Sequence, residues 1–139
     1  MQYFIDKKEL ECFYYNAISN TNFGLIVTEI DGLHDAFEND IEFIEVPGRN
    51  GELIVDNQRV KSRDLKISGY IDKELTNFSM SDIYKGMNKW LKSEMKYHKL
   101  EFVNEDLGFN ALCYKFKMNE TIKDLAKVEI TFRVQGEDI

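Results

Sequence analysis

The stretch "LKISGYI", Leu65–Ile71, decides the fold class of this chain. Apolar or small residues occupy every second position of it, namely Leu65, Ile67, Gly69 and Ile71. A lysine, a serine and a tyrosine stand between them. Such a two-residue repeat is typical of a strand that buries one face and exposes the other. The stretch therefore predicts a β-strand that packs one face on a core.

Other stretches of the chain share this repeat. Residues 127–134, "KVEITFRV", are rich in β-branched and aromatic side chains, which favour a pleated surface. Residues 98–103 and 111–118 flank the turn-like "NEDLGFN" and so predict a hairpin. One face of its second strand is expected to carry Leu112, Tyr114, Phe116 and Met118. Shorter β-like runs occupy residues 11–16, 23–30 and 41–46.

One segment follows a helical repeat instead. Apolar residues recur there every three or four positions, which gathers them on one face of a helix. They are Ile83, Met87, Trp90 and Leu91, with Met95 as a further candidate. Ser79, three residues before Asp82, has the position of a helix cap. We expect one helix over about Met80–Glu94, with Trp90 in the core.

The order of these elements indicates the fold class. Several strands come first, then one helix, then three more strands, with no internal repeat or flexible linker. This order fits an antiparallel sheet with one helix packed on it better than alternating β-α-β units. We therefore predict an α+β fold, mainly an antiparallel β-sandwich or partial barrel with one helix, as a single domain over residues 1–139.

Composition narrows the function classes. The 139 residues carry a net charge of -7, which argues against a partner held by sequence-independent phosphate contacts. No apolar run approaches the 18 residues that a membrane span needs, and the first residues do not have the pattern of a secretory signal. We expect folding in the cytoplasm and no membrane partner. Cys12 and Cys113 lie too far apart for a zinc or redox motif, so two reduced thiols are expected.

No constellation of residues predicts catalysis or a cofactor. The two histidines, His34 and His98, have no recognisable nucleophile or acid beside them. Asp31, His34 and Asp35 could supply three metal ligands on paper, but "DGLHD" lacks the alternating donors of a calcium loop. The acids of "FENDIEFIE" lie in a strand-like segment where exposed carboxylates are ordinary. We predict a protein that is not an enzyme and holds neither metal nor cofactor.

The stretch "VPGRNGEL", Val46–Leu53, contains the only proline of the chain. It lacks the lysine and serine of a phosphate-binding loop and continues into β-prone residues. Asn50-Gly51 is the dipeptide that suits a type I′ turn, so we expect a tight hairpin with Arg49 at its tip. An ordinary solvated turn and a contact with a partner's carboxylate or carbonyl groups both remain open for this arginine.

Three runs of the chain together resemble the N-terminal region of the siphophage distal tail proteins. They are "FGLIVTEIDGL", "IEFIEVPGRNGELIVDN" and "VKSRDLKISGYI". The resemblance implies a β-sandwich with a helix and an extended hairpin, assembled as a hexameric ring that joins the tail tube to the tail-tip or baseplate proteins. A central channel would let DNA pass without specific binding. It also implies a structural protein of the virion tail, from a phage or prophage, assembled in the cytoplasm of the bacterial host.

The hairpin core then becomes the candidate site. The matching residues are Pro47, Gly48, Arg49, Asn50 and Gly51, for which we infer a contact with a neighbouring subunit. An acidic chain fits a channel for DNA, because a lumen that attracted phosphates would hold the genome back. Two other functions stay open: a tail-tube-like or secretion-tube subunit, and a small carbohydrate-binding module that uses Tyr70, Tyr97 or Trp90.

Overall fold

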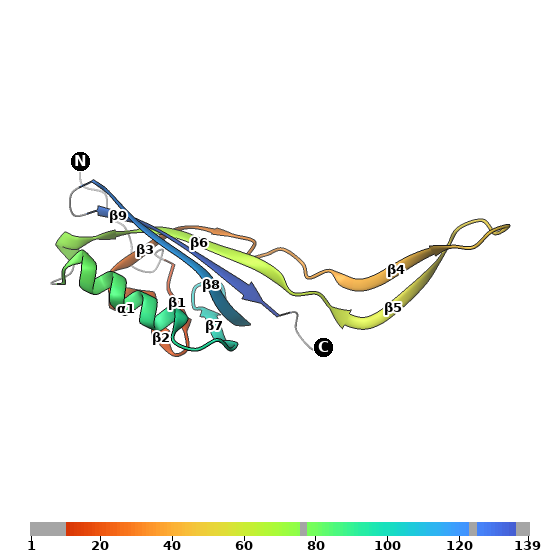
Figure 1. Ribbon diagram of the computed structural model, residues 1–139, viewed down its shortest axis with the longest axis horizontal. Helices are drawn as coiled ribbons and strands as arrows, with labels where there is room; N and C mark the ends of the chain where they lie inside the picture. Colours follow the sequence, from red (N-terminus) through yellow and green to blue (C-terminus); the bar gives the residue numbers. More distant parts are fainter. Residues whose placement is uncertain (1–10, 76–77, 123–124, 136–139) are drawn as a thin grey trace.

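The chain folds into a body and a long two-stranded arm that projects from one end of it (Figure 1). The computed structural model describes residues 11–75, 78–122 and 125–135. The arm consists of β4 (Asn39–Glu45), β5 (Glu52–Val60) and the turn between them. Within these ranges the two strands pair only with each other and form a sheet of their own. The structure therefore separates one hairpin from the main sheet.

The body is built on a seven-stranded antiparallel sheet. Its strand order is β2-β1-β7-β8-β9-β6-β3, and neighbouring strands all run antiparallel. The strands are β1 (Phe13–Tyr15), β2 (Ile18–Ser19), β3 (Leu25–Asp31), β6 (Arg63–Asp72), β7 (His98–Phe102), β8 (Leu107–Ile122) and β9 (Leu125–Val134). Two short 3-10 helices, η1 (Asn20–Phe23) and η2 (Lys73–Leu75), follow β2 and β6.

The core lies between the curved sheet and the single helix α1 (Met80–Lys92). Two strands separate β1 from β9 in the sheet order, yet the ring centroids of Tyr15 and Phe132 are 4.9 Å apart. The sheet must therefore curl until β1 packs across the core on β9. The expected α+β class, mainly antiparallel with one helix, is confirmed, and the sheet does not close into a barrel.

The helix begins as its sequence predicts. The Ser79 side-chain oxygen accepts a hydrogen bond from the backbone N–H of Asp82 at 3.2 Å, which satisfies one of the free donors of the first turn. Trp90 is 5% exposed, and its indole N–H donates to the Tyr15 carbonyl oxygen at 2.7 Å. The helix ends at Lys92, so Met95 lies beyond it and is 77% exposed. Trp90 belongs to the core as predicted, whereas Met95 does not share the apolar face.

One predicted strand face is wrong because β8 contains a bulge. Cys113 pairs with Phe132 and Lys115 with Thr131, so Tyr114 is an extra residue in the ladder. An extra residue exchanges the two faces of the strand beyond it. Before the bulge the buried residues of β8 are Phe109, Ala111 and Cys113, and after it Phe116 and Met118 pack on the core. Leu112 and Tyr114 therefore do not share a face with Phe116.

Gly69 occupies its place in β6 because the neighbouring strand passes very close. A Cβ at this position would lie 2.2 Å from the carbonyl oxygen of Ile26 on β3. Real Cβ atoms do not approach oxygen this closely, so any side chain would displace β3. The glycine within the alternating "LKISGYI" is thus a requirement of sheet pairing.

The thiol of Cys113 is expected to resist modification. Burial raises its pKa from 9.0 to about 11, which leaves very little reactive thiolate at neutral pH. We expect a thiol-specific reagent at pH 8 to modify Cys12, which is half-buried, at least about tenfold faster than Cys113. Cys113 is also fully buried, so its rate should stay low as long as the body is folded. Cys12→Ser and Cys113→Ser variants assign the two rates, and equal rates would contradict the expectation.

Candidate functional site

The arm carries an exposed pair of apolar side chains on each of its two faces. Register sets Phe43 directly opposite Ile54, and on the other face Ile44 opposite Leu53. Phe43 and Ile54 are 60% and 62% exposed, and the side chains of Ile44 and Leu53 are also exposed. A two-stranded hairpin is at best marginally stable alone in water, because it has no third strand or helix to cover an apolar face. The arm therefore presents the kind of surface that a partner covers.

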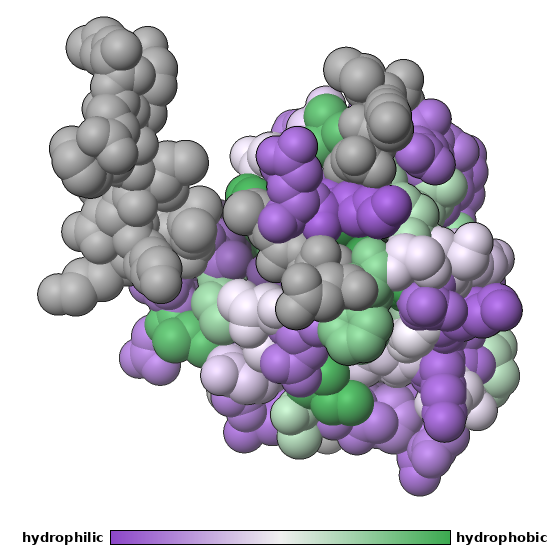
Figure 2. Space-filling model, turned by 90° about the vertical axis from the view of Figure 1, so that its left-hand side faces the viewer, coloured by the Kyte–Doolittle hydropathy of each residue, from purple (hydrophilic) through white to green (hydrophobic). Residues whose placement is uncertain are grey.

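The end of the body opposite the arm has a different character. Figure 2 views that end, where hydrophilic residues predominate and hydrophobic residues form small separate patches. Single exposed apolar residues of this kind are normal on a protein surface. The paired, two-sided apolar surface belongs to the arm.

The five predicted site residues lie together at the tip of the arm, and all of them are exposed. The turn is not the predicted type I′ turn at Asn50-Gly51. The backbone N–H of Arg49 donates to the Val46 carbonyl oxygen at 3.2 Å, and Gly48 has a φ of 80°. A proline before a glycine of positive φ gives a type II turn, because the ring of Pro47 fixes its φ near −65°. The type I′ prediction is wrong because Pro47 and Gly48 form the two central residues of the turn, ahead of Asn50-Gly51 in the chain.

Gly51 does adopt the positive φ expected of it, at 93°. A Cβ there would meet nothing within 4 Å, so the cost of a side chain is one of backbone conformation alone. We expect Gly51→Val to destabilise the tip by about 1–2 kcal/mol and to raise hydrogen exchange in β5 while leaving the melting of the body unchanged. Asn50→Val is the matched control, since Asn50 has no positive φ. Equal exchange in both variants would contradict this account.

Side chains at the base of the arm hold its two strands together. Asp40 is 9% exposed and accepts hydrogen bonds from the Arg59 Nε and, at 3.3 Å, from the Asn57 Nδ2. The hydrogen bond from Arg59 is the main cause that lowers the pKa of Asp40 below its ordinary value. Beside them the backbone N–H of Lys61 donates to the Glu38 carbonyl oxygen at 2.8 Å. These contacts tie β4 to β5 at the end of the arm nearest the body.

We call the contacts of Asp40 with Arg59 and Asn57 the clamp, and the sequence alone does not predict it. The β4–β5 register shifts between Asn39 and Ile41, and Gln58 in the irregular stretch of β5 has a φ of 60°. The shift brings Arg59 opposite Asp40, 19 residues earlier in the chain. An acid and an arginine that far apart give no signal unless the register is known.

The candidate catalytic and metal residues do not converge. His34 lies 3.4 Å from a Glu105 carboxylate oxygen in an exposed position, and His98 lies 3.4 Å from a Glu94 carboxylate oxygen. Across the described ranges, no group of three histidine, cysteine, aspartate or glutamate side chains could hold a metal ion. Nor does any helix in that part of the chain have the length and apolar character to cross a membrane.

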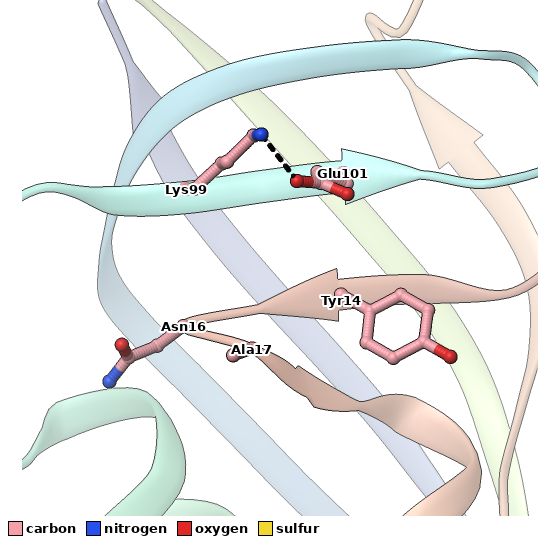
Figure 3. Close-up of a pocket in the computed structure, with 5 residues that line it drawn as sticks. All are labelled: Tyr14, Asn16, Ala17, Lys99 and Glu101. Carbon is pink, nitrogen blue, oxygen red and sulfur yellow. Dashed lines mark ion pairs between the residues drawn. The ribbon is translucent and has the colours of Figure 1, made fainter.

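Among the described residues, one candidate for a small-ligand site is an open hollow of about 450 Å³ beside the β1–β2 turn. It is lined by Tyr14, Asn16, Ala17, Lys99 and Glu101. Figure 3 shows the ion pair of Lys99 and Glu101 on β7, with 2.7 Å between Nζ and Oε1, while the Asn16 side chain points away from it. The polar groups thus do not aim at one common point, as they do in a specific ligand site.

The aromatic residues considered for carbohydrate binding are also dispersed. Trp90 is buried, whereas Tyr70 and Tyr97 are 38% and 39% exposed. Tyr70 lies on β6 and Tyr97 just before β7, with β9 and β8 between these strands. The three side chains therefore do not form one stacking platform.

The fold thus defines a class of protein: an open antiparallel sheet covered by one helix and extended by a hairpin arm. A solved structure with this fold is that of the SPP1 Dit (gp 19.1) protein, described as a paradigm of the hub adsorption apparatus in Gram-positive infecting phages. The TM-score is 0.70 at 15% sequence identity, over 91% of this chain and 50% of that chain. This chain thus spans half the length of that protein.

The fold implied by the sequence resemblance is confirmed by this comparison. No protein-family model matches the chain, and the search of curated proteins finds no match. The similarity is therefore one of fold, and the function has to be argued from the arm.

Proposed function

We propose that this chain is a structural protein of a phage tail, and specifically a subunit of the distal tail hub. The observation that carries the proposal is the arm, which exposes an apolar pair on each face and, among the described residues, shares no strand pairing with the body. A surface of this kind suits assembly, because burying it on another subunit removes apolar area from water. The fold of a phage hub protein with the same architecture supports the proposal.

In this proposal the chain forms one domain over residues 1–139 and assembles as a hexameric ring. The ring joins the tail tube to the tail-tip or baseplate proteins in the virion tail, after assembly in the host cytoplasm. The tip residues 47–51 contact a neighbouring subunit. DNA passes through the channel without specific binding, in keeping with the net charge of -7. The proposed role is architectural and requires no catalysis.

A tail-tube-like or secretion-tube subunit is the second candidate, because an exposed hairpin would serve assembly there too. The two candidates differ in the assemblies that they predict. A tube subunit should form long stacks, whereas a hub subunit should stop at one closed ring. A carbohydrate-binding module is less well supported, because its aromatic residues lie on separate elements.

Purified chain studied by light scattering over a range of concentrations, followed by negative-stain imaging, tests the proposal. We expect closed rings of six subunits. Co-expression with the products of the neighbouring genes should place the ring at the end of a tail tube. Neighbouring genes that do not encode tail proteins, together with a chain that forms no ring with their products, would overturn the proposed function.

A further inference from the structure

The Asn50-Gly51 pair at the tip of the arm lies outside the turn that the tip forms. That turn is centred on Pro47-Gly48, and β5 begins only at Glu52. Both residues of the pair are exposed, and the tip lies at the far end of the arm, away from the body (Figure 1). In the part of the chain that the structure describes, neither the backbone N–H of Gly51 nor the side-chain amide of Asn50 has a hydrogen-bond partner.

An asparagine that precedes a glycine can react with the backbone nitrogen of that glycine. This nitrogen gives its proton to a base such as hydroxide and attacks the side-chain carbonyl carbon of the asparagine. A new C–N bond closes a five-membered succinimide ring. The bond from that carbon to the amide nitrogen breaks, and the amide nitrogen takes a proton from water and leaves as ammonia. Water then opens the ring at either of its carbonyl groups, which gives aspartate or isoaspartate.

We propose that Asn50 is a site of spontaneous deamidation, at which the folded chain converts asparagine to aspartate and isoaspartate. Glycine has no Cβ to crowd the closing ring, and a Cβ built on Gly51 would meet nothing within 4 Å, so no neighbouring group blocks the approach. Ring closure also breaks no hydrogen bond, because both reacting groups have none. The reaction belongs to the single chain, so this inference does not rest on the proposed function.

Two other asparagines show how the fold restrains the same groups elsewhere. Asn57 is exposed on the same arm, but its Nδ2 donates to the Asp40 Oδ1 at 3.3 Å. The backbone N–H that follows it, that of Gln58, donates to the Asp56 Oδ1 at 2.8 Å. Asn20 is 1% exposed, and its side-chain amide bonds to the backbone on two sides. Ring closure at either asparagine would break hydrogen bonds that are in place.

The reaction changes both the charge and the length of the tip. Residues 45–52 hold one arginine and two glutamates, and Glu45 stands directly opposite Glu52. Deamidation of Asn50 adds a third carboxylate beside these two, and like charges so placed repel. Isoaspartate also lengthens the main chain by one carbon atom. A chain that remains unassembled therefore changes with time at the tip of its arm.

Ageing of the purified chain at neutral pH, at a concentration where light scattering shows single chains, tests the proposal. Cleavage after lysine gives a peptide of residues 9–61 that holds Asn20, Asn50 and Asn57, and its fragment masses show which asparagine has gained an oxygen for an amide NH. We expect Asn50 to convert at least about tenfold faster than Asn57, and Gly51→Ala to slow it at least about tenfold. Methylation by an isoaspartyl methyltransferase measures the isoaspartate.

The same measurement on chain unfolded in guanidinium chloride tests the structural part of the inference. Asn50 should convert in the folded chain at within about threefold of its unfolded rate, whereas Asn57 should convert at least about threefold more slowly when folded. A folded rate at Asn50 more than about tenfold below the unfolded rate would overturn the proposal. So would a rate that Gly51→Ala leaves unchanged. Aspartate without isoaspartate would overturn it too, because direct hydrolysis would then replace the succinimide route.

Discussion

Replacing Phe43 and Ile54 together with serine is expected to abolish assembly while the body stays folded. The two side chains form a cross-strand pair and are 60% and 62% exposed in the single chain. Burying either of them fully on a partner would contribute about 1.5–3 kcal/mol. Loss of both should raise the concentration for half-assembly by at least about a hundredfold. Light scattering over a concentration series measures this shift.

Thermal melting of the same variant tests whether the arm acts separately from the body. The arm shares no strand pairing with the seven-stranded sheet, so the melting temperature of the single chain should change little. Met95→Ser is the matched control, because Met95 is 77% exposed but lies outside the arm. Normal assembly of the double variant would remove the Phe43 and Ile54 pair from the interface. A marked fall in melting temperature would show that the arm stabilises the body.

Trp90→Ala is expected to cost about 4 kcal/mol of unfolding free energy, a large part of the 5–15 kcal/mol of an ordinary domain. The Trp90 ring stacks on Phe23 at 4.9 Å and on Phe13 at 5.8 Å, so its loss leaves a cavity where η1, β1 and α1 meet. It also leaves the Tyr15 carbonyl oxygen without its indole donor. We expect a melting temperature lower by more than about 10 °C.

Two further substitutions separate the contribution of the Trp90 ring to stability from that of its N–H donor. Trp90→Phe keeps an aromatic ring in the core but removes the N–H donor, and it should cost about 1–3 kcal/mol. Lys89→Ala, on the exposed side of the same helix, should stay within about 0.5 kcal/mol of the unchanged chain. Urea unfolding followed by circular dichroism gives all three values. A cost below about 1 kcal/mol for Trp90→Ala would show that the core can collapse around the missing ring.

The parts of the fold that the sequence predicted are those in which a local repeat meets a single core. The two-residue repeat of Leu65–Ile71 places Leu65, Ile67 and Ile71 in the core, as expected. The helical repeat around Trp90 and the cap at Ser79 likewise act within a few residues. Both patterns are local consequences of burial and of hydrogen bonding, so they can be recognised without knowledge of the partner strands.

The features that escaped prediction depend on pairing between distant residues. The bulge at Tyr114 exists only relative to β9, and the clamp of Asp40 and Arg59 only relative to the shifted register of the arm. The tip contains two dipeptides that favour a turn, and the turn forms at Pro47-Gly48 rather than at Asn50-Gly51. The run "IEFIEV" lacks strict alternation, and the structure gives the reason, since this hairpin carries apolar side chains on both faces and covers neither of them with its own body.

The separation of the two sheets has a mechanical consequence. The arm continues into the body through two chain segments, residues 32–38 before β4 and residues 61–62 after β5, and the backbone hydrogen bond from Lys61 to Glu38 links these two segments. Neither segment is a strand of the seven-stranded sheet, so the arm can bend at its base without breaking the pairing of any strand of the body. The joint is therefore the compliant part of the molecule, and the sheet is the stiff part. In the ring that we propose, such a joint would let each body keep its shape while the diameter of the ring changes.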